Sequence, residues 1–383
     1  MGVARRARFG RALPYRHRPR LCLALCAAVL LAALAASRAP PLPPLSFASR
    51  SSLVRSVPQV AVAHSALAAG SSSLKVAVLQ DQQVPKEEAI RALTSRGFDV
   101  VWSLQEPSDA WALVTVTAPV TEEVLEKHPH CRVVAVSFTG YNQVDLEACK
   151  KRGVAVTNVP AYSTDAVAEL AVGLALAVYR EIPGSERTLR SGGWAHSSGG
   201  MELRDKVIGV VGLGNAGLRA AEIFSAFRPK ELLGWSRREK PAFAEPPLSG
   251  KQVSLEELFK RSDVVSLHIA LNAETKGIIG RELLQHLHKD AVLINVARGA
   301  VVDQSAMIDL LCQRRFRAGL DVFETEPIPQ GDPILQVPQD QVVLTPHVAY
   351  KSVEALRRRI AITAENLRAF ADGKPQNLVL PAS

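Results

Sequence analysis

The chain has 383 residues, 47% of them hydrophobic, so it is long enough to bury two cores and carry a further segment. Its net charge of +9 comes entirely from residues 1–74, which hold ten of the 46 Lys and Arg and no acid, leaving 36 basic against 37 acidic residues. The remaining chain has no basic stripe with interleaved aromatic residues, which excludes nucleic acid as the expected partner.

Residues 1–73 have the composition of a targeting leader. An Arg-rich opening precedes the apolar run Leu21–Ala36, which is short for a membrane span and close to a signal-peptide core. The following stretch contains Ser and Arg but no acid, as transit peptides do. This order resembles the bipartite leaders of plastid proteins in algae with secondary plastids. We expect a plastid location and no membrane association of the mature form; a single mitochondrial or chloroplast presequence, or an uncleaved anchor, is the alternative.

Strand and helix patterns alternate from Lys75 onward, which is typical of a parallel sheet with crossover helices. The predicted strands are 75–80, 99–104, 112–117, 132–138 and 154–159, and the predicted helices are 87–97, 120–128 and 146–152. Cys131, Cys149 and Cys312 are the cysteines of this mature part, and their spacing predicts neither a metal site nor a disulfide framework.

A long helix over 164–179, with Ser163 or Thr164 as its expected cap, carries the chain into a second α/β unit. The predicted strands of that unit are 207–211, 231–235, 264–269, 291–296, 317–322 and 342–347, and its predicted helices are 254–261, 281–288 and 304–313. The last helix, 355–373, is expected to pack back on the first unit.

The second unit opens with the stretch Val207–Gly217, an apolar strand that runs into three glycines and then a helix. Gly212, Gly214 and Gly217 have the spacing that lets a tight turn form, lets backbone approach a pyrophosphate and lets helix pack on strand. This context predicts dinucleotide binding, whereas a glycine-rich turn without a ligand is the plainer alternative.

The next strand ends in Ser236, Arg237 and Arg238, with no acidic residue at its tip. NAD sites place a carboxylate there for the ribose 2′-hydroxyl, whereas a 2′-phosphate requires cations and small hydrogen-bond donors. The sequence therefore predicts NADPH as the preferred cofactor, with NADH possible; a solvated basic turn is the alternative.

Three later strands end in polar residues that a keto-acid reduction needs. Arg298 suits the grip on a substrate carboxylate, and His347 suits proton donation to the developing alkoxide. Glu326 is the carboxylate expected to hold the imidazolium, with Glu324 as its rival. Alternatively, Arg298 forms a structural salt bridge, Glu326 lies in a turn before Pro327, and His347 is a loop residue.

Taken together, INVARGAVVD, AGLDVFETEP and TPHVA, downstream of VIGVVGLGNAG, resemble the D-isomer-specific 2-hydroxyacid dehydrogenase family from about Lys75 to the C-terminus. The resemblance implies that Arg298, Glu326 and His347 are catalytic, that Asn215 and Ala216 join the glycines at the pyrophosphate, and that Asp321 holds the nicotinamide carboxamide. It further implies that the N–H groups of Thr139 and Gly140 meet the substrate carboxylate. The residues AYKS, which follow His347 and Val348, differ from the Gly-rich sequence common at this place in the family.

The resemblance also implies an α/β fold with two Rossmann-like domains and a homodimer. The expected organisation is a doubly wound dinucleotide-binding domain, 161–347, inserted in a smaller flavodoxin-like substrate domain formed by 74–160 and 348–383. The expected function is NAD(P)H-dependent reduction of a small 2-keto acid, glyoxylate or hydroxypyruvate, to the D-2-hydroxyacid. Phosphoglycerate is disfavoured because the strand end at 112–121 offers no cation. A dinucleotide-sensing corepressor-like protein and an NAD-dependent D-lactate or phosphoglycerate dehydrogenase are the alternatives.

Overall fold

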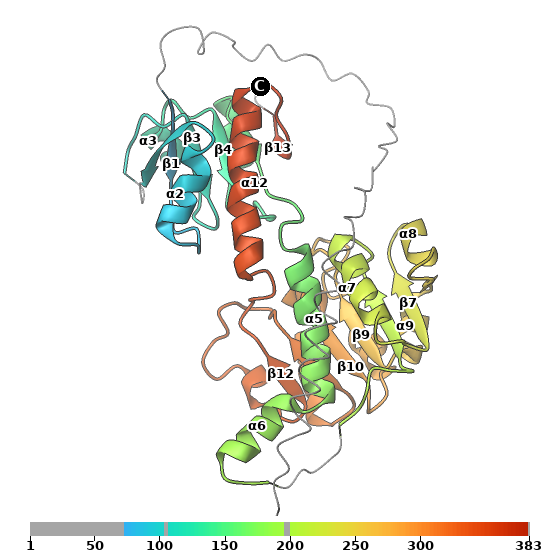
Figure 1. Cartoon of the computed structure of the whole chain (residues 1–383). Coiled ribbons are helices and arrows are strands. Elements are labelled where there is room, and N and C mark those ends of the chain that lie inside the picture. Colours follow the sequence, from blue (N-terminus) through green and yellow to red (C-terminus); the bar gives the residue numbers. More distant parts are fainter. Residues whose placement is uncertain (1–72, 103–105, 195–199, 382–383) are drawn as a thin grey trace, which may run out of the picture. The chain divides into compact units, whose positions relative to one another are not determined.

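The computed structural model describes residues 73–102, 106–194 and 200–381 of the chain. The leader prediction therefore lies outside the described residues, apart from Ser73. The described chain forms two sheets, each with helices on both faces (Figure 1). This arrangement confirms the predicted α/β class.

The first sheet has six strands in the order β13-β5-β4-β3-β1-β2. The strands β1 to β5 are parallel and follow the flavodoxin-like order 2-1-3-4-5, while β13 pairs antiparallel with β5 at the edge. Its elements are β1 (Leu74–Val78), α2 (Lys86–Thr94), β2 (Phe98–Trp102), β3 (Ala112–Thr115), α3 (Glu122–Lys127), β4 (Val133–Val136), α4 (Leu146–Lys151), β5 (Ala155–Thr157), α12 (Val353–Ala371) and β13 (Leu378–Leu380).

Most residues in the strands of this sheet are apolar, because both faces are covered. In β4, for example, Val134 and Val136 face one hydrophobic core while Val133 and Ala135 face the other. The terminal helix α12, red in Figure 1, packs on α2 and β4 and contributes Ala364 to the second of these cores. The chain thus returns to its first sheet after completing the second.

The second sheet has seven strands in the order β12-β11-β10-β9-β6-β7-β8, and every pairing is parallel. Its elements are α5 (Thr164–Tyr179), α6 (Ile182–Arg190), β6 (Val207–Val211), α7 (Asn215–Ser225), β7 (Glu231–Trp235), α8 (Pro241–Ala244), β8 (Lys251–Gln252), α9 (Leu255–Arg261), β9 (Val264–Leu267), α10 (Arg281–Gln285), β10 (Val292–Asn295), η1 (Gly299–Val301), α11 (Gln304–Cys312), β11 (Arg317–Leu320), η2 (Pro333–Gln336) and β12 (Val342–Leu344). Helix α5 packs on α7, β10 and β11, in the core that covers one face.

The sequence patterns did not predict the short 3-10 helices η1 and η2, nor the elements α6, α8, β8 and β13. The strands β8 and β13 have only two and three residues, too few to show a period. Helix α6 begins IPGS, which reads as a loop, and it is separated from α5 by Glu181 in the left-handed region at φ 51°. Ser163, one of the two expected caps, is the N-cap residue of α5, but its side chain makes no capping hydrogen bond. The Thr164 hydroxyl donates to the Ala161 carbonyl at 3.0 Å.

Candidate active site

The carboxyl ends of the second sheet gather most of the predicted site residues. Strand order reverses at β6, since β7 and β8 continue to one side of it and β9 to β12 to the other. Ligands of doubly wound sheets bind outside the strand ends at such a reversal. The glycine turn follows β6 directly, so it lies at this position.

The glycine turn fits a dinucleotide pyrophosphate. A Cβ on Gly217 would stand 1.9 Å from the Gly212 carbonyl oxygen, so this helix can approach its strand only with glycine there. A Cβ on Gly214 would meet no atom within 4 Å, which leaves open space at the start of α7. The described residues supply no acceptor for the N–H groups of Asn215, Ala216 and Gly217, so this helix end has donors available for an anion.

His268, after β9, supports this turn and was not singled out from the sequence. Its carbonyl oxygen lies 2.6 Å from the Cβ position of Gly212, which also has a positive φ of 100°. Its Nε2 faces the Ser266 hydroxyl at 2.9 Å, and its buried Nδ1 has no partner among the described residues. Burial lowers the pKa of His268 to about 4, so the imidazole is neutral at pH 7.

The Ser236–Arg238 turn follows β7, and a side chain from the neighbouring strand β8 holds it in place. Gln252 donates from Nε2 to the Ser236 hydroxyl at 3.1 Å, and its Oε1 accepts from the Lys240 N–H at 2.6 Å. The Ser236 hydroxyl donates in turn to the Arg238 carbonyl. Ser236 is thus used within the turn, while the Arg237 side chain is 63% exposed and Arg238 is exposed.

His347 and Glu326 form a direct pair. His347 Nδ1 lies 2.6 Å from Glu326 Oε2, and the other carboxylate oxygen accepts from the Phe323 N–H at 2.9 Å. The two side chains are 31% and 33% exposed, so the pair is reachable from solvent. With Nδ1 bound to the carboxylate, Nε2 is the nitrogen left to exchange a proton with a ligand. The rival Glu324 is exposed, and its N–H donates to Gln304 Oε1 instead.

Arg298 follows β10, and its backbone is fixed by a buried amide. Asn295 donates from Nδ2 to the Arg298 carbonyl at 3.1 Å and accepts from the Ala297 N–H at 3.0 Å. The guanidinium is exposed and donates to the Ala297 carbonyl at 2.7 Å. Asn295 is a positioning residue that the sequence alone did not mark, although it stands inside the INVARG motif.

Asp321 fixes the loop that carries His347. This residue is fully buried, and its carboxylate accepts from Thr345 Oγ1 at 2.6 Å and from the N–H groups of Val348 and Ala349 at 2.9 and 2.8 Å. Its carbonyl accepts from the His347 N–H at 2.8 Å. The side chain therefore stabilises the loop that carries His347. Its contact with a nicotinamide carboxamide stays a prediction.

Thr139 and Gly140 follow β4 at the carboxyl end of the first sheet. Asn158 fixes them by donating to the Thr139 carbonyl at 2.8 Å, while the Thr139 hydroxyl donates to the Val159 carbonyl. The described residues supply no acceptor for the N–H groups of Thr139 and Gly140. Both groups are thus free to meet a carboxylate.

Tyr350, in the AYKS segment, packs edge-on against the catalytic candidate His347. The ring centroids are 5.9 Å apart at an interplanar angle of 84°, and the Phe138 ring also packs edge-on against Tyr350, with centroids 5.4 Å apart. The phenol pairs with the Gln83 amide at 3.4 Å. The departure from the family pattern therefore places a bulky ring beside the imidazole.

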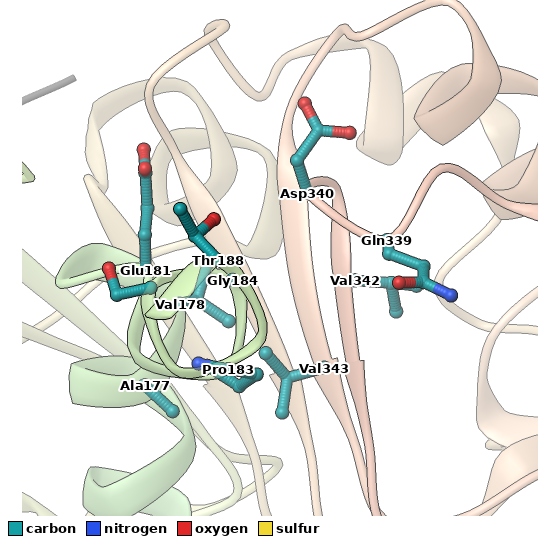
Figure 2. A pocket seen from close by; sticks show the side chains of 11 residues that line it. Ala177, Val178, Glu181, Pro183, Gly184, Thr188, Gln339, Asp340, Val342 and Val343 are labelled. Atoms are coloured by element: carbon teal, nitrogen blue, oxygen red, sulfur yellow. The ribbon is translucent and has the colours of Figure 1, made fainter. Parts of the chain in front are cut away.

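A cavity of about 200 Å³ lies at the opposite, amino-terminal side of the second sheet, between α5, α6 and β12. Figure 2 shows Glu181 and Asp340 on its two sides. No predicted site residue lines it. Within the described ranges, no group of three or more His, Cys, Asp or Glu is arranged to hold a metal ion. The helices in those ranges also include none that is long and apolar enough to cross a membrane.

Comparison with known proteins agrees with this geometry. The family model "D-isomer specific 2-hydroxyacid dehydrogenase, NAD binding domain" matches residues 172–349. A glyoxylate reductase of Thermococcus litoralis is 39% identical over 287 residues, which cover 72% of this chain and 85% of the relative. A hydroxypyruvate reductase of Blautia hydrogenotrophica is 32% identical over 279 residues, covering 71% and 85%.

Among solved structures, an acyclic imino acid reductase (Bsp5) in complex with NADPH and D-arginine superposes with a TM-score of 0.68 at 31% identity, covering 80% of this chain and 100% of that one. The doubly wound sheet, the glycine turn and these relatives define a nicotinamide-dinucleotide-dependent oxidoreductase. More narrowly, the chain belongs to the D-isomer-specific 2-hydroxyacid dehydrogenase family, which confirms the resemblance seen in its motifs.

Proposed function

We propose that this dehydrogenase reduces glyoxylate or hydroxypyruvate to the D-2-hydroxyacid and prefers NADPH to NADH. The observation that carries the proposal is the 2.6 Å pair of His347 and Glu326 on the same sheet edge as Arg298 and the glycine turn. Relatives named for glyoxylate and hydroxypyruvate reduction support the substrate class.

In the proposed mechanism, the Arg298 guanidinium binds the substrate carboxylate, with the N–H groups of Thr139 and Gly140 as further donors. A nicotinamide dinucleotide held at the glycine turn would supply the hydride for the keto carbon. The electron pair of the C=O double bond moves to oxygen, which takes a proton from His347 Nε2. Glu326 keeps the ring oriented and stabilises the imidazolium before that transfer.

The preference for NADPH is supported by the charge at the end of β7. The turn presents the exposed cations Arg237 and Arg238, with no carboxylate at the position where one would bind a ribose 2′-hydroxyl. Guanidinium groups bind phosphate through charge-assisted, often bidentate hydrogen bonds. Both arginines are therefore proposed ligands of the 2′-phosphate.

We expect Arg237→Ala combined with Arg238→Ala to lower kcat/KM for NADPH by about 10- to 100-fold, since two charge-assisted contacts are lost. The value for NADH should stay within about threefold. Arg314→Ala, which removes an exposed arginine paired with Asp340, is the matched control and should change neither. Initial rates with glyoxylate, hydroxypyruvate and pyruvate give kcat/KM for each cofactor.

The same rates test the alternative function. A wild-type preference for NADH with pyruvate would favour the D-lactate alternative.

We also propose a homodimer, supported by the apolar surface of α6. Ile182 and Leu189 on this helix are 53% and 59% exposed, and the following Trp194 is 84% exposed. Ile182 and Leu189 are seven residues apart and share one face of the helix. Exposed apolar patches mark protein interfaces. Ile182→Glu combined with Leu189→Glu should convert the dimer to a monomer in light scattering. Leu335→Glu, which changes a 47% exposed leucine elsewhere, should leave the mass unchanged. A monomeric wild type would refute the dimer.

The proposed location is the plastid, with the mitochondrion as alternative, and it rests on the composition of residues 1–73. Fusion of this segment to a fluorescent protein in an alga with secondary plastids tests it. Plastid import supports the proposal, and a signal confined to mitochondria would overturn it.

A further inference from the structure

The Arg237 side chain forms an ion pair with Glu274. Nη1 of Arg237 lies 2.7 Å from Oε2 of Glu274, in the turn that follows β9. Strands β7 and β9 are the two neighbours of β6. The ion pair therefore joins the two segments that flank the glycine turn, and it engages one of the two cations proposed for the 2′-phosphate.

Both backbones that carry this pair are fixed by other bonds. The Glu274 N–H donates to Asn272 Oδ1 at 2.9 Å, and the buried Thr275 hydroxyl donates to the Ala270 carbonyl at 2.7 Å. On the other side, Gln252 holds the Ser236–Arg238 turn. A change of partner at Arg237 consequently requires only rotation of the two long side chains.

The pair is exposed, with 63% of the Arg237 side chain and 71% of the Glu274 side chain accessible, so its net stabilisation is small. A phosphate monoester carries more charge and three acceptor oxygens, and it competes well for the guanidinium. A neutral ribose hydroxyl does not compete well with Glu274 for the guanidinium. The carboxylate left behind would repel a phosphate, whereas it could accept a hydrogen bond from a hydroxyl.

We propose that Glu274 is a specificity-determining residue that competes with the cofactor 2′-phosphate for Arg237 and so limits the selectivity for NADPH. This inference rests on the proposed NADPH site at Arg237 and Arg238. The sequence at the end of β7 does not indicate Glu274, because this residue comes from the turn after β9, on the other side of β6.

The test is calorimetric binding of 2′,5′-ADP and 5′-AMP to the full chain, two probes that differ by the 2′-phosphate. We expect Glu274→Gln to tighten binding of 2′,5′-ADP by about three- to tenfold and to leave 5′-AMP within twofold, because only the phosphate competes with the carboxylate. In an Arg237→Ala background, Glu274→Gln should change the affinity for 2′,5′-ADP by no more than about twofold. An effect exerted through Arg237 is lost in a double-mutant cycle when Arg237 is already absent.

Glu257→Gln is the matched control, since Glu257 forms an exposed ion pair with Arg261 within α9. It should change neither affinity. The proposal is overturned if Glu274→Gln leaves 2′,5′-ADP binding unchanged, tightens 5′-AMP equally, or acts equally without Arg237. If the wild type binds both probes equally, the NADPH preference fails, but a gain that needs Arg237 still supports the role of Glu274.

Discussion

Replacing His347 with glutamine is expected to lower kcat for keto-acid reduction by about 10²- to 10⁴-fold, the range typical of general acid–base catalysis. Glutamine can keep a hydrogen bond to Glu326 Oε2, now 2.6 Å from the imidazole, but it cannot deliver a proton to the substrate oxygen. The KM for the keto acid should change by less than about threefold, because the proposed carboxylate contacts at Arg298 and at the N–H groups of Thr139 and Gly140 remain.

The neighbouring carboxylates provide a matched pair for the same prediction. Glu326→Gln should also lower kcat, since it removes the charge that stabilises the imidazolium while its amide oxygen can still accept from the Phe323 N–H. Glu324→Gln, two residues away, should leave kcat within about twofold, because the Glu324 side chain is exposed and makes no ion pair with His347. Wild-type turnover in His347→Gln, or equal loss in both glutamate variants, would contradict the assignment.

Gly299→Ala is expected to lower both stability and turnover, although the added group is a single methyl. A Cβ at Gly299 would stand 1.9 Å from the Phe323 carbonyl carbon and 2.4 Å from the Glu324 nitrogen. Gly299 directly follows Arg298, and the Phe323–Glu324 peptide leads to Glu326. Since these atoms are backbone, relief requires the two segments to separate. Overpacking of this kind costs about 1–3 kcal/mol or more.

The effect of Gly299→Ala on kcat should reach about 10²-fold, because a shift near 1 Å in a positioning segment has that consequence. Thermal unfolding and steady-state rates measure the two effects. Gly173→Ala is the control: a Cβ there meets no atom within 4 Å, and alanine favours the interior of α5. It should be neutral or stabilising. A Gly299→Ala variant with wild-type kcat and Tm would show that the two segments need not touch.

The elements with clear periodicity could be predicted from the sequence, and those defined by tertiary contact could not. The helix at 164–179 has its predicted bounds, because a long apolar pattern identifies both its ends. The antiparallel edge strand β13 has three residues, two of which pair with β5, and no pattern of that length indicates a partner.

The site divides in the same way. The motifs predicted Arg298, Glu326 and His347 as catalytic residues. They also left Glu324 as a candidate carboxylate, and only the geometry shows that Glu326 is the one that pairs with His347. Spacing could not reveal contacts between distant strand ends. The bonds of Asn295 to the Arg298 loop, of Gln252 to the Ser236–Arg238 turn and of Glu274 to Arg237 depend on how strands lie beside one another. The buried state of Asp321 likewise follows from packing and not from its motif.

The bonds made by Asp321 have a consequence for how this part of the gene can diverge. Its carboxylate binds the main-chain N–H groups of Val348 and Ala349, and its own carbonyl receives the N–H of His347. Proline at 348 or 349 would remove a donor, and an insertion or deletion between 345 and 349 would put these amides out of register. Divergence in this loop is therefore constrained by chain length and amide donors, in addition to residue identity at Thr345, His347 and the buried Ala349.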